Sequence, residues 1–215
     1  MAGESSPPAD LHAVFVNVDD PAVTEIRSLG EKAVAWAASS VADDAASSIV
    51  AFSPAGAVKY CHLKNLPASG PLLADSPRIT AIKLTSLRLR NPANAPDAAE
   101  KLALESMRAD VEAKVALPRL LVQRIDHSNG TKEWRVYRPL IAVARCEACH
   151  GSTRWQSAEL RDTLQARYPS DVAVDYTAGD WRGMASATVS DAPAARAVQI
   201  TQEAQPTGKS ASTQR

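Results

Sequence analysis

The chain is poor in cysteine and in aromatic residues. Cysteine occurs only at positions 61, 146 and 149, and aromatic residues make up 5% of the 215 residues. The hydrophobic fraction of 45% therefore depends heavily on alanine, which predicts helices packed through small side chains rather than an aromatic core. The length is that of one domain with tails, and it allows a substantial core.

The chain also lacks an excess of charge and a long apolar run. Lys plus Arg and Asp plus Glu each number 24, so the formal net charge is zero. This balance gives no reason to expect nucleic acid or an anionic membrane as a partner. No run of about 18 apolar residues occurs, so we predict no transmembrane segment. The first eight residues have neither the positive nor the apolar region of a signal peptide.

Two of the three cysteines stand in the pattern Cys146-Glu-Ala-Cys149-His150. This CxxCH pattern is the attachment motif for a c-type haem: each thiol adds to one vinyl group, and the histidine can then bind the iron. A thioredoxin-type CxxC requires a βαβ context and gives the adjacent histidine no role. Half of a zinc site has only Cys61 left to complete it. We therefore predict one covalent haem c, attached at Cys146 and Cys149, with His150 as a metal ligand.

Covalent haem attachment normally takes place outside the cytoplasm. The motif therefore predicts a periplasmic or otherwise exported protein whose signal peptide is absent from this sequence. A redox partner or a signalling protein is expected, but the sequence does not identify it, and a homodimer is left open.

The order of predicted elements indicates an α+β fold, with long N-terminal helices followed by an antiparallel sheet of about four strands. We expect a loosely held lead-in over residues 1–20, a single domain over 21–190 and a disordered tail over 191–215. The predicted helices cover residues 21–50, 53–67, 98–115 and 157–167. The predicted strands cover residues 79–90, 118–126, 132–144 and 183–189.

The residues alone do not identify the second axial ligand of the iron. The candidates are Cys61, His62, His12, His127, Met107, Met184 or an empty position. Met107 recurs with the apolar residues of a predicted helix, so we expect it in the core. His127 borders a predicted hairpin turn and is expected to be exposed, and His12 lies in the lead-in. Cys61 and His62 are neighbours on one predicted helix, so their side chains diverge by about 100° and only one can face a haem. A lone cysteine on an apolar helix face ordinarily packs in the core.

Several motifs outside CxxCH form a more specific pattern, and two positions depart from it. The motifs are Ala57-Val-Lys-Tyr-Cys61 with Leu66-Pro67, Thr85-Ser86-Leu-Arg-Leu-Arg90-Asn91-Pro92-Ala-Asn94-Ala-Pro96-Asp97, Arg138-Pro139-Leu140 ahead of CxxCH, and Tyr168-Pro169-x-Asp171 leading to Tyr176, Gly179-Asp180 and Arg182-Gly183. From about residue 57 to 183 the chain resembles the bacterial single-haem c-type family with a PAS-like sensor fold, long known only as a domain of unknown function. Glu147 stands where the family usually has Leu, and Asp175 where it usually has Gly.

The resemblance implies a haem held by a histidine and a cysteine thiolate, the latter matching Cys61. An anionic sulfur stabilises ferric over ferrous iron, so the Fe–S bond is expected to weaken on reduction. The implied function is a redox or small-ligand sensor, with a small ligand able to bind at the iron. The alternative is a periplasmic one-electron carrier without ligand exchange. A haem enzyme such as a peroxidase ranks last, because no distal His/Arg pair is evident.

Arginines near the predicted sheet are candidates for contacts with the cofactor. Arg88 and Arg90 share one face of a predicted strand and could pair with haem propionates, which arginine binds bidentately. A solvated strand face is an equally good reading of the same pair. Tyr137 and Arg138 are weaker candidates for cofactor contacts.

Overall fold

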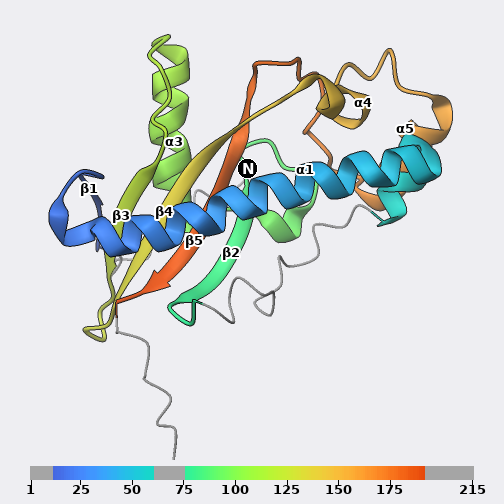
Figure 1. The fold of residues 1–215 in the computed structure, drawn as a ribbon. Helices are drawn as coiled ribbons and strands as arrows, with labels where there is room; N and C mark the ends of the chain where they lie inside the picture. Colours follow the sequence, from blue (N-terminus) through green and yellow to red (C-terminus); the bar gives the residue numbers. More distant parts are fainter. Residues whose placement is uncertain (1–11, 61–75, 192–215) are drawn as a thin grey trace, which may run out of the picture.

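A five-stranded antiparallel sheet forms the centre of the protein in the computed structural model, which describes residues 12–60 and 76–191. The strands are β1 (His12–Val16), β2 (Ile79–Thr85), β3 (Leu121–Asp126), β4 (Lys132–Ile141) and β5 (Trp181–Ser190), in the order β1-β3-β4-β5-β2 (Figure 1). The expectation of helices combined with an antiparallel sheet is confirmed. The described residues contain five strands rather than the expected four or so.

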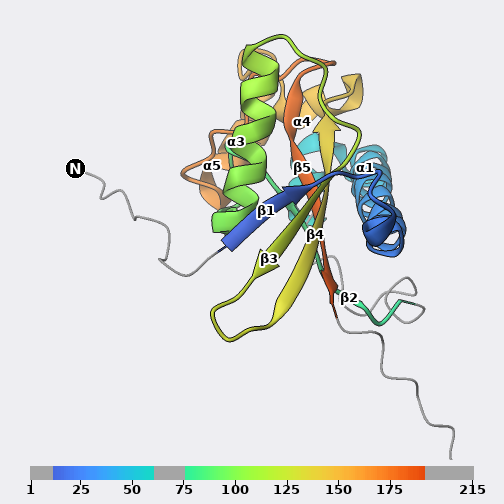
Figure 2. The same cartoon turned by 90° about the vertical axis from the view of Figure 1, so that its left-hand side faces the viewer.

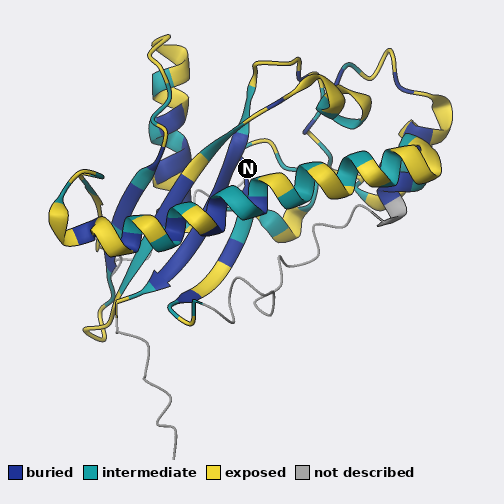
Figure 3. Cartoon of the chain, viewed as in Figure 1, coloured by how far each residue is buried: buried dark blue, intermediate teal, exposed yellow. Residues whose placement is uncertain are grey.

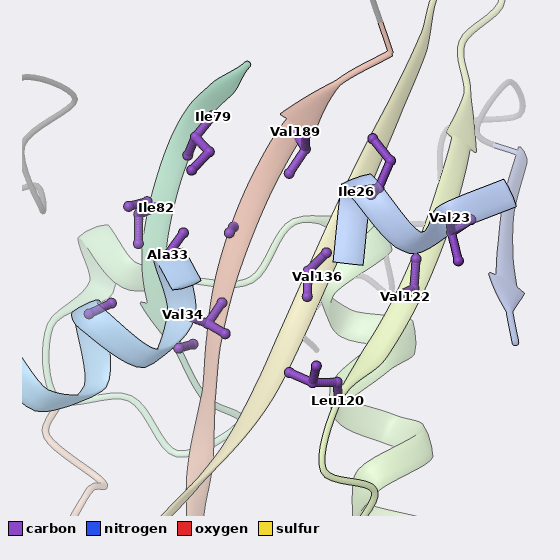
Figure 4. Packing of buried hydrophobic residues seen from close by; sticks show 13 residues of the cluster. Val23, Ile26, Ala33, Val34, Ile79, Ile82, Leu120, Val122, Val136 and Val189 are labelled. Carbon is purple, nitrogen blue, oxygen red and sulfur yellow. The ribbon is translucent and has the colours of Figure 1, made fainter. Parts of the chain in front are cut away.

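One face of the sheet is covered by the long helix α1 (Thr24–Tyr60). Val23, which precedes α1, and Ile26, Ala33 and Val34 on it pack against apolar side chains of the sheet, including Val136 (Figure 4). Burying one such branched side chain contributes about 1.5–3 kcal/mol, so this layer supplies much of the stability of the fold.

The opposite face of the sheet is covered by α3 (Ala98–Glu112), and Figure 2 shows α1 and α3 on either side of the strands. Leu104 and Met107 of α3 pack against Tyr137 and Met184 of the sheet. Asp97 caps α3: its side chain accepts from the N–H of Glu100, the third helical residue, in a reciprocal capping box.

The helix α1 has two arms that meet at Ser53. Ser53 has a φ of +65°, and its Oγ accepts from the N–H of Gly56 at 3.4 Å, so it ends the first arm and caps the second. Residues 38–53 contain no fully buried position (Figure 3). The second arm packs Ala55 and Val58 against α5 (Ala158–Arg167), whose predicted range is confirmed.

Two sequence predictions are wrong. Residues 12–16 belong to the sheet as edge strand β1, paired with β3, and not to a loose lead-in. The strand predicted through Arg90 ends at Thr85, and the chain continues irregularly to the short 3-10 helix η2 (Pro92–Asn94). The physical reason is that the arginine side chains of this segment bind backbone oxygens elsewhere in the chain, as described below.

Several other predictions concern residues outside the described part. These are residues 1–11, the predicted helix end near residue 67, and the tail beyond residue 191. Within the described residues, no helix combines the length and the apolar character needed to cross a membrane.

Candidate functional site

The CxxCH motif begins where β4 leaves the sheet. The 3-10 helix η3 (Ala144–Cys146) and α4 (Glu147–His150) wind it into a short helical segment. Cys146 and Cys149 are three residues apart in this segment, so their side chains share one face of the helical turn. Both are partly exposed, and no disulfide joins them to each other. Two thiols on one face can attach to a single extended ligand.

The imidazole of His150 is fixed by a backbone acceptor. Its Nδ1 atom lies 2.7 Å from the backbone oxygen of Ala173, and because a carbonyl oxygen only accepts, Nδ1 is the donor. Nε2 is then the unprotonated nitrogen that can bind a metal. Burial, with the positive charges of Arg90 and Arg182, lowers the pKa of His150 to about 3, although the residue keeps partial access to solvent. The ring is therefore neutral at pH 7.

The segment before β5 forms a wall beside the motif. The N–H of Tyr176 donates to the oxygen of His150 at 2.9 Å, and the N–H of Asp175 donates to the oxygen of Gly151 at 3.1 Å. A Cβ on Gly151 would lie 2.6 Å from the backbone oxygen of Glu147, so only glycine fits there. Asp175 has a φ of +59°, in the left-handed region that favours glycine. Glycine, which the resemblance implies at this position, would adopt this conformation without strain.

Arg90 joins the motif to this wall. Its Nε donates to Asp171 Oδ2 at 2.7 Å, and its Nη2 donates to the oxygens of Cys149 at 2.7 Å and Ala173 at 3.3 Å. The side chains of Arg90 and Asp171 are 12% and 10% exposed, so the ion pair is nearly buried. Arg90 thus orients both the residue that carries the second thiol and the carbonyl group that holds His150.

Tyr176 lies between His150 and two guanidinium groups. Its ring stands edge-on to the imidazole, with centroids 6.4 Å apart and planes at 85°. The Cζ atoms of Arg88 and Arg182 lie 4.3 and 5.0 Å from the Tyr176 centroid, within the range of cation–π contacts. Arg88 also donates to two backbone oxygens of residues 172–174. The contact of Arg88 and Arg90 with propionates stays a prediction. The structure brings both into one cluster around His150, which consists of Arg88, Arg90, Asp171, Ala173, Tyr176 and Arg182.

Comparison with known families covers more than half of the chain. A family model described as Tll0287-like matches residues 69–190. The chain belongs to the Tll0287-like family. The matched range includes every residue of the cluster around His150, and it begins after Cys61.

A solved structure and the curated proteins complete the comparison. The Tll0287-like chain is similar to the crystal structure of the cyanobacterial haem protein Tll0287, with 18% identity over 82% of this chain and 99% of that chain and a TM-score of 0.47. No curated protein matches the chain.

Two predicted cofactor contacts lie apart from the cluster in this Tll0287-like protein. Tyr137 is fully buried beneath α3, where its hydroxyl donates to Gln123 Oε1 at 2.7 Å and burial raises its pKa. Arg138 follows on the opposite face of β4 and is exposed. The structure therefore does not place either side chain against His150.

The two described candidate histidines lie at the far end of the sheet from the motif. His12 Nδ1 is 3.4 Å from Asp126, and His127 Nε2 is 3.6 Å from Glu133, both beside the β3–β4 turn. The ten residues of β4 separate this turn from the motif by about 30 Å. Neither histidine can act as the second axial ligand to an iron bound at His150.

The two candidate methionines lie in the core and not beside His150. Met107 and Met184 are fully buried with Tyr137 in the cluster beneath α3, where they pack as core residues. Cys61 and His62 lie outside the described residues, directly after the arm of α1 that packs on α5. Of the candidate side chains, these two are the ones that the structure leaves open.

One of the two alternatives to haem attachment loses support. Among the described residues, no group of three or more His, Cys, Asp or Glu side chains could hold a metal ion, but Cys61, which the zinc alternative requires, lies outside these residues. All strand pairs in this part of the chain are antiparallel, so the motif does not stand in a βαβ unit.

Large apolar side chains are exposed near the motif. Ile141 and Val143 precede it, Trp155 follows it, and Val172 adjoins the carbonyl that holds His150; they are 46%, 44%, 89% and 54% exposed. Exposed apolar groups of this kind commonly mark a surface that a ligand or partner covers.

Sequence reasoning assigned no role to several residues that build the site. Gln156 is buried and donates from Nε2 to the oxygen of Cys149 at 3.2 Å. Asp171, Tyr176 and Arg182 belong to the motifs that the chain shares with the resembling family. Their presence in these motifs was the one sign in the sequence that they take part in the site. Their roles depend on contacts between distant segments, which spacing along the chain does not reveal.

Proposed function

We propose that this Tll0287-like protein carries one c-type haem, attached through Cys146 and Cys149 and bound at the iron by Nε2 of His150. The observation that carries the proposal is the hydrogen bond from His150 Nδ1 to Ala173, because it leaves Nε2 unprotonated and fixes the ring. The two thiols on one helical face and the exposed apolar side chains near the motif suit a large, flat, apolar cofactor.

We further propose Cys61 as the ligand opposite His150, as the family resemblance implies. When bound, haem iron supplies a one-electron redox centre. A Cys61 thiolate would favour ferric iron through its negative charge, so it would hold reduced iron more weakly. The proposed function is therefore an exported redox or small-ligand sensor that acts on a redox or signalling partner. Arg90 keeps the His150 side of the site fixed while the Cys61 side responds.

Haem attachment is tested by expressing the chain with an export signal and a c-type maturation system. The expected product keeps its haem on a denaturing gel, resists extraction into acidified organic solvent and fractionates with exported proteins. Cys146→Ala and Cys149→Ala should each compromise attachment, whereas Cys61→Ser should keep it. Absence of covalent haem from the unmutated chain, when a control cytochrome matures in the same cells, would contradict the proposal.

Optical spectra distinguish a sensor from a simple electron carrier. For the sensor we expect a six-coordinate ferric spectrum and a change of ligation on reduction, followed by binding of carbon monoxide. Unchanged ligation in both oxidation states would instead identify a one-electron carrier. A high-spin ferric haem that reacts with peroxide would indicate an enzyme.

A further inference from the structure

A polar cavity of about 160 Å³ lies on the α3 side of the sheet, apart from the cluster around His150. Strands β2, β4 and β5 form its floor, and the beginning of α3 forms its wall. Its polar lining consists of Lys83, Asp97, Glu100, Arg135, Ser186 and Thr188. The proposed haem site uses none of these residues.

Two ion pairs line the cavity, and their formal charges cancel. Lys83 Nζ lies 2.7 Å from Glu100 Oε2, and Arg135 Nη1 lies 2.9 Å from Asp97 Oδ2. The Glu100 side chain is 2% exposed, yet its other oxygen, Oε1, is 3.7 Å from Arg135 Nη1, beyond hydrogen-bond distance. Lys83 Nζ also donates to the backbone oxygen of Ala95, and Nε and Nη2 of Arg135 bind Oε1 of Glu133, a third carboxylate that lies outside the lining. An ammonium group carries three protons and a guanidinium five, so one proton of Lys83 and two of Arg135 stay available. The cavity therefore offers both an acceptor and charged donors.

Two hydroxyl groups on the floor of the cavity add to these polar contacts. Ser186 and Thr188 are 2% and 8% exposed, and both line the cavity from β5. Neither side chain hydrogen-bonds to another residue in the described part of the chain. Each hydroxyl can donate and accept, so a polar group inside the cavity could hydrogen-bond to it. The cavity has room for about five water molecules, so its ligand must be small.

We propose that this cavity binds a small zwitterion with the chemistry and size of a short α-amino acid. The carboxylate would accept from Arg135 or Lys83, and the ammonium would donate to Glu100 Oε1 and a hydroxyl of β5. The cavity presents cationic donors beside a carboxylate acceptor, so a ligand that carries both a carboxylate and an ammonium can satisfy both kinds of group together. A singly charged ligand would leave one kind without a partner, and burying an unpaired charge is costly.

The test is calorimetric titration and thermal unfolding of the full haem-loaded chain with glycine, alanine and serine. Acetate and methylammonium carry the two charged groups separately and serve as ligand controls. We expect the amino acids to bind and to raise Tm, and the two controls to bind at least about tenfold more weakly. Because haem is not the readout, failure here leaves the proposed haem function intact. If haem attachment fails instead, the same titration of the full chain without haem still tests the cavity.

Two variants test the location of the ligand. Thr188→Val keeps the shape of the side chain and removes one hydroxyl, so amino-acid affinity should fall about fivefold to tenfold. Ser186→Ala should act in the same direction and serves if the first variant does not fold. Thr80→Val, at an exposed position of the same sheet, should leave affinity unchanged. No amino-acid binding, equal affinity in all three variants, or equal binding of acetate would each overturn the proposal.

Discussion

The Nδ1 atom of His150 lies 2.7 Å from the backbone oxygen of Ala173, which is 23 residues further along the chain. This contact fixes the tautomer of His150 with the proton on Nδ1, because a carbonyl oxygen can only accept. It also means that the metal-facing nitrogen depends on the position of the 171–176 segment. Residues that hold this segment are therefore positioning residues for the site.

Arg90→Ala should destabilise the protein strongly, because it leaves the nearly buried Asp171 without its cation. The expected loss is about 3 kcal/mol in the free energy of unfolding, measured with urea. Arg119→Ala removes an exposed ion pair with Glu31 and should change stability by less than about 0.5 kcal/mol. Adding Asp171→Asn to Arg90→Ala should recover part of the loss. Equal effects of Arg90→Ala and Arg119→Ala would show that the Arg90 contacts do not brace the site.

Asp175→Gly should stabilise the protein, because glycine adopts the φ of +59° at this position without a Cβ penalty. The expected gain is about 0.5–1 kcal/mol, offset in part by the greater freedom of glycine in the unfolded chain. Asp175→Ala is the matched control and should destabilise, since alanine tolerates the left-handed region less well than aspartate. Thermal or urea unfolding should rank the variants as Gly, Asp, Ala. Any order that places Ala above Gly contradicts this account of the wall segment.

Asp97 should make the protein sensitive to acid. Burial opposes the shift, but the N–H of Glu100 and the guanidinium of Arg135 together lower the pKa of Asp97 below 3.8. The folded protein therefore binds fewer protons here than the unfolded chain in acid. Its contribution to stability is present above the unfolded pKa and is lost as pH falls through the lowered value.

Asp97→Asn tests this pH dependence, because asparagine still caps a helix but does not titrate. Between pH 7 and pH 3 the variant should lose less unfolding free energy than the unmutated protein. Asp43→Asn, at an exposed position of α1, should leave the acid sensitivity as it is. An unchanged pH profile for Asp97→Asn would remove Asp97 as a source of acid sensitivity.

Cys61→Ser should leave the haem covalently attached, since the thioether bonds involve Cys146 and Cys149. It should shift the ferric optical spectrum and raise the midpoint potential, because a neutral hydroxyl stabilises ferric iron less than a thiolate. Spectroelectrochemistry measures both effects in one titration, with His62→Ala as the matched neighbour. A spectrum that changes in His62→Ala and not in Cys61→Ser would assign the second ligand to His62.

Some features of the fold follow from local sequence patterns. The caps at Asp20, Ser53 and Asp97 are local, because each cap uses only the residue itself and its next few neighbours. The helix predicted over residues 157–167 lies at 158–167, and the strands predicted over 118–126 and 132–144 form β3 and β4. Residues 87–90 show where such reasoning fails. Their alternation resembles a strand, but Arg88 and Arg90 bind backbone oxygens of distant segments instead of extending the sheet.

For the candidate site, the sequence alone determined the chemistry: two thiols and an imidazole at the spacing of a haem attachment motif. Only the tertiary structure decided how these groups are held. It joined Arg90 to Asp171, His150 to Ala173 and Tyr176 to two arginines, and it placed four candidate ligands elsewhere. The reason is that covalent spacing is fixed within a few residues, whereas contacts across tens of residues exist only after the chain has packed.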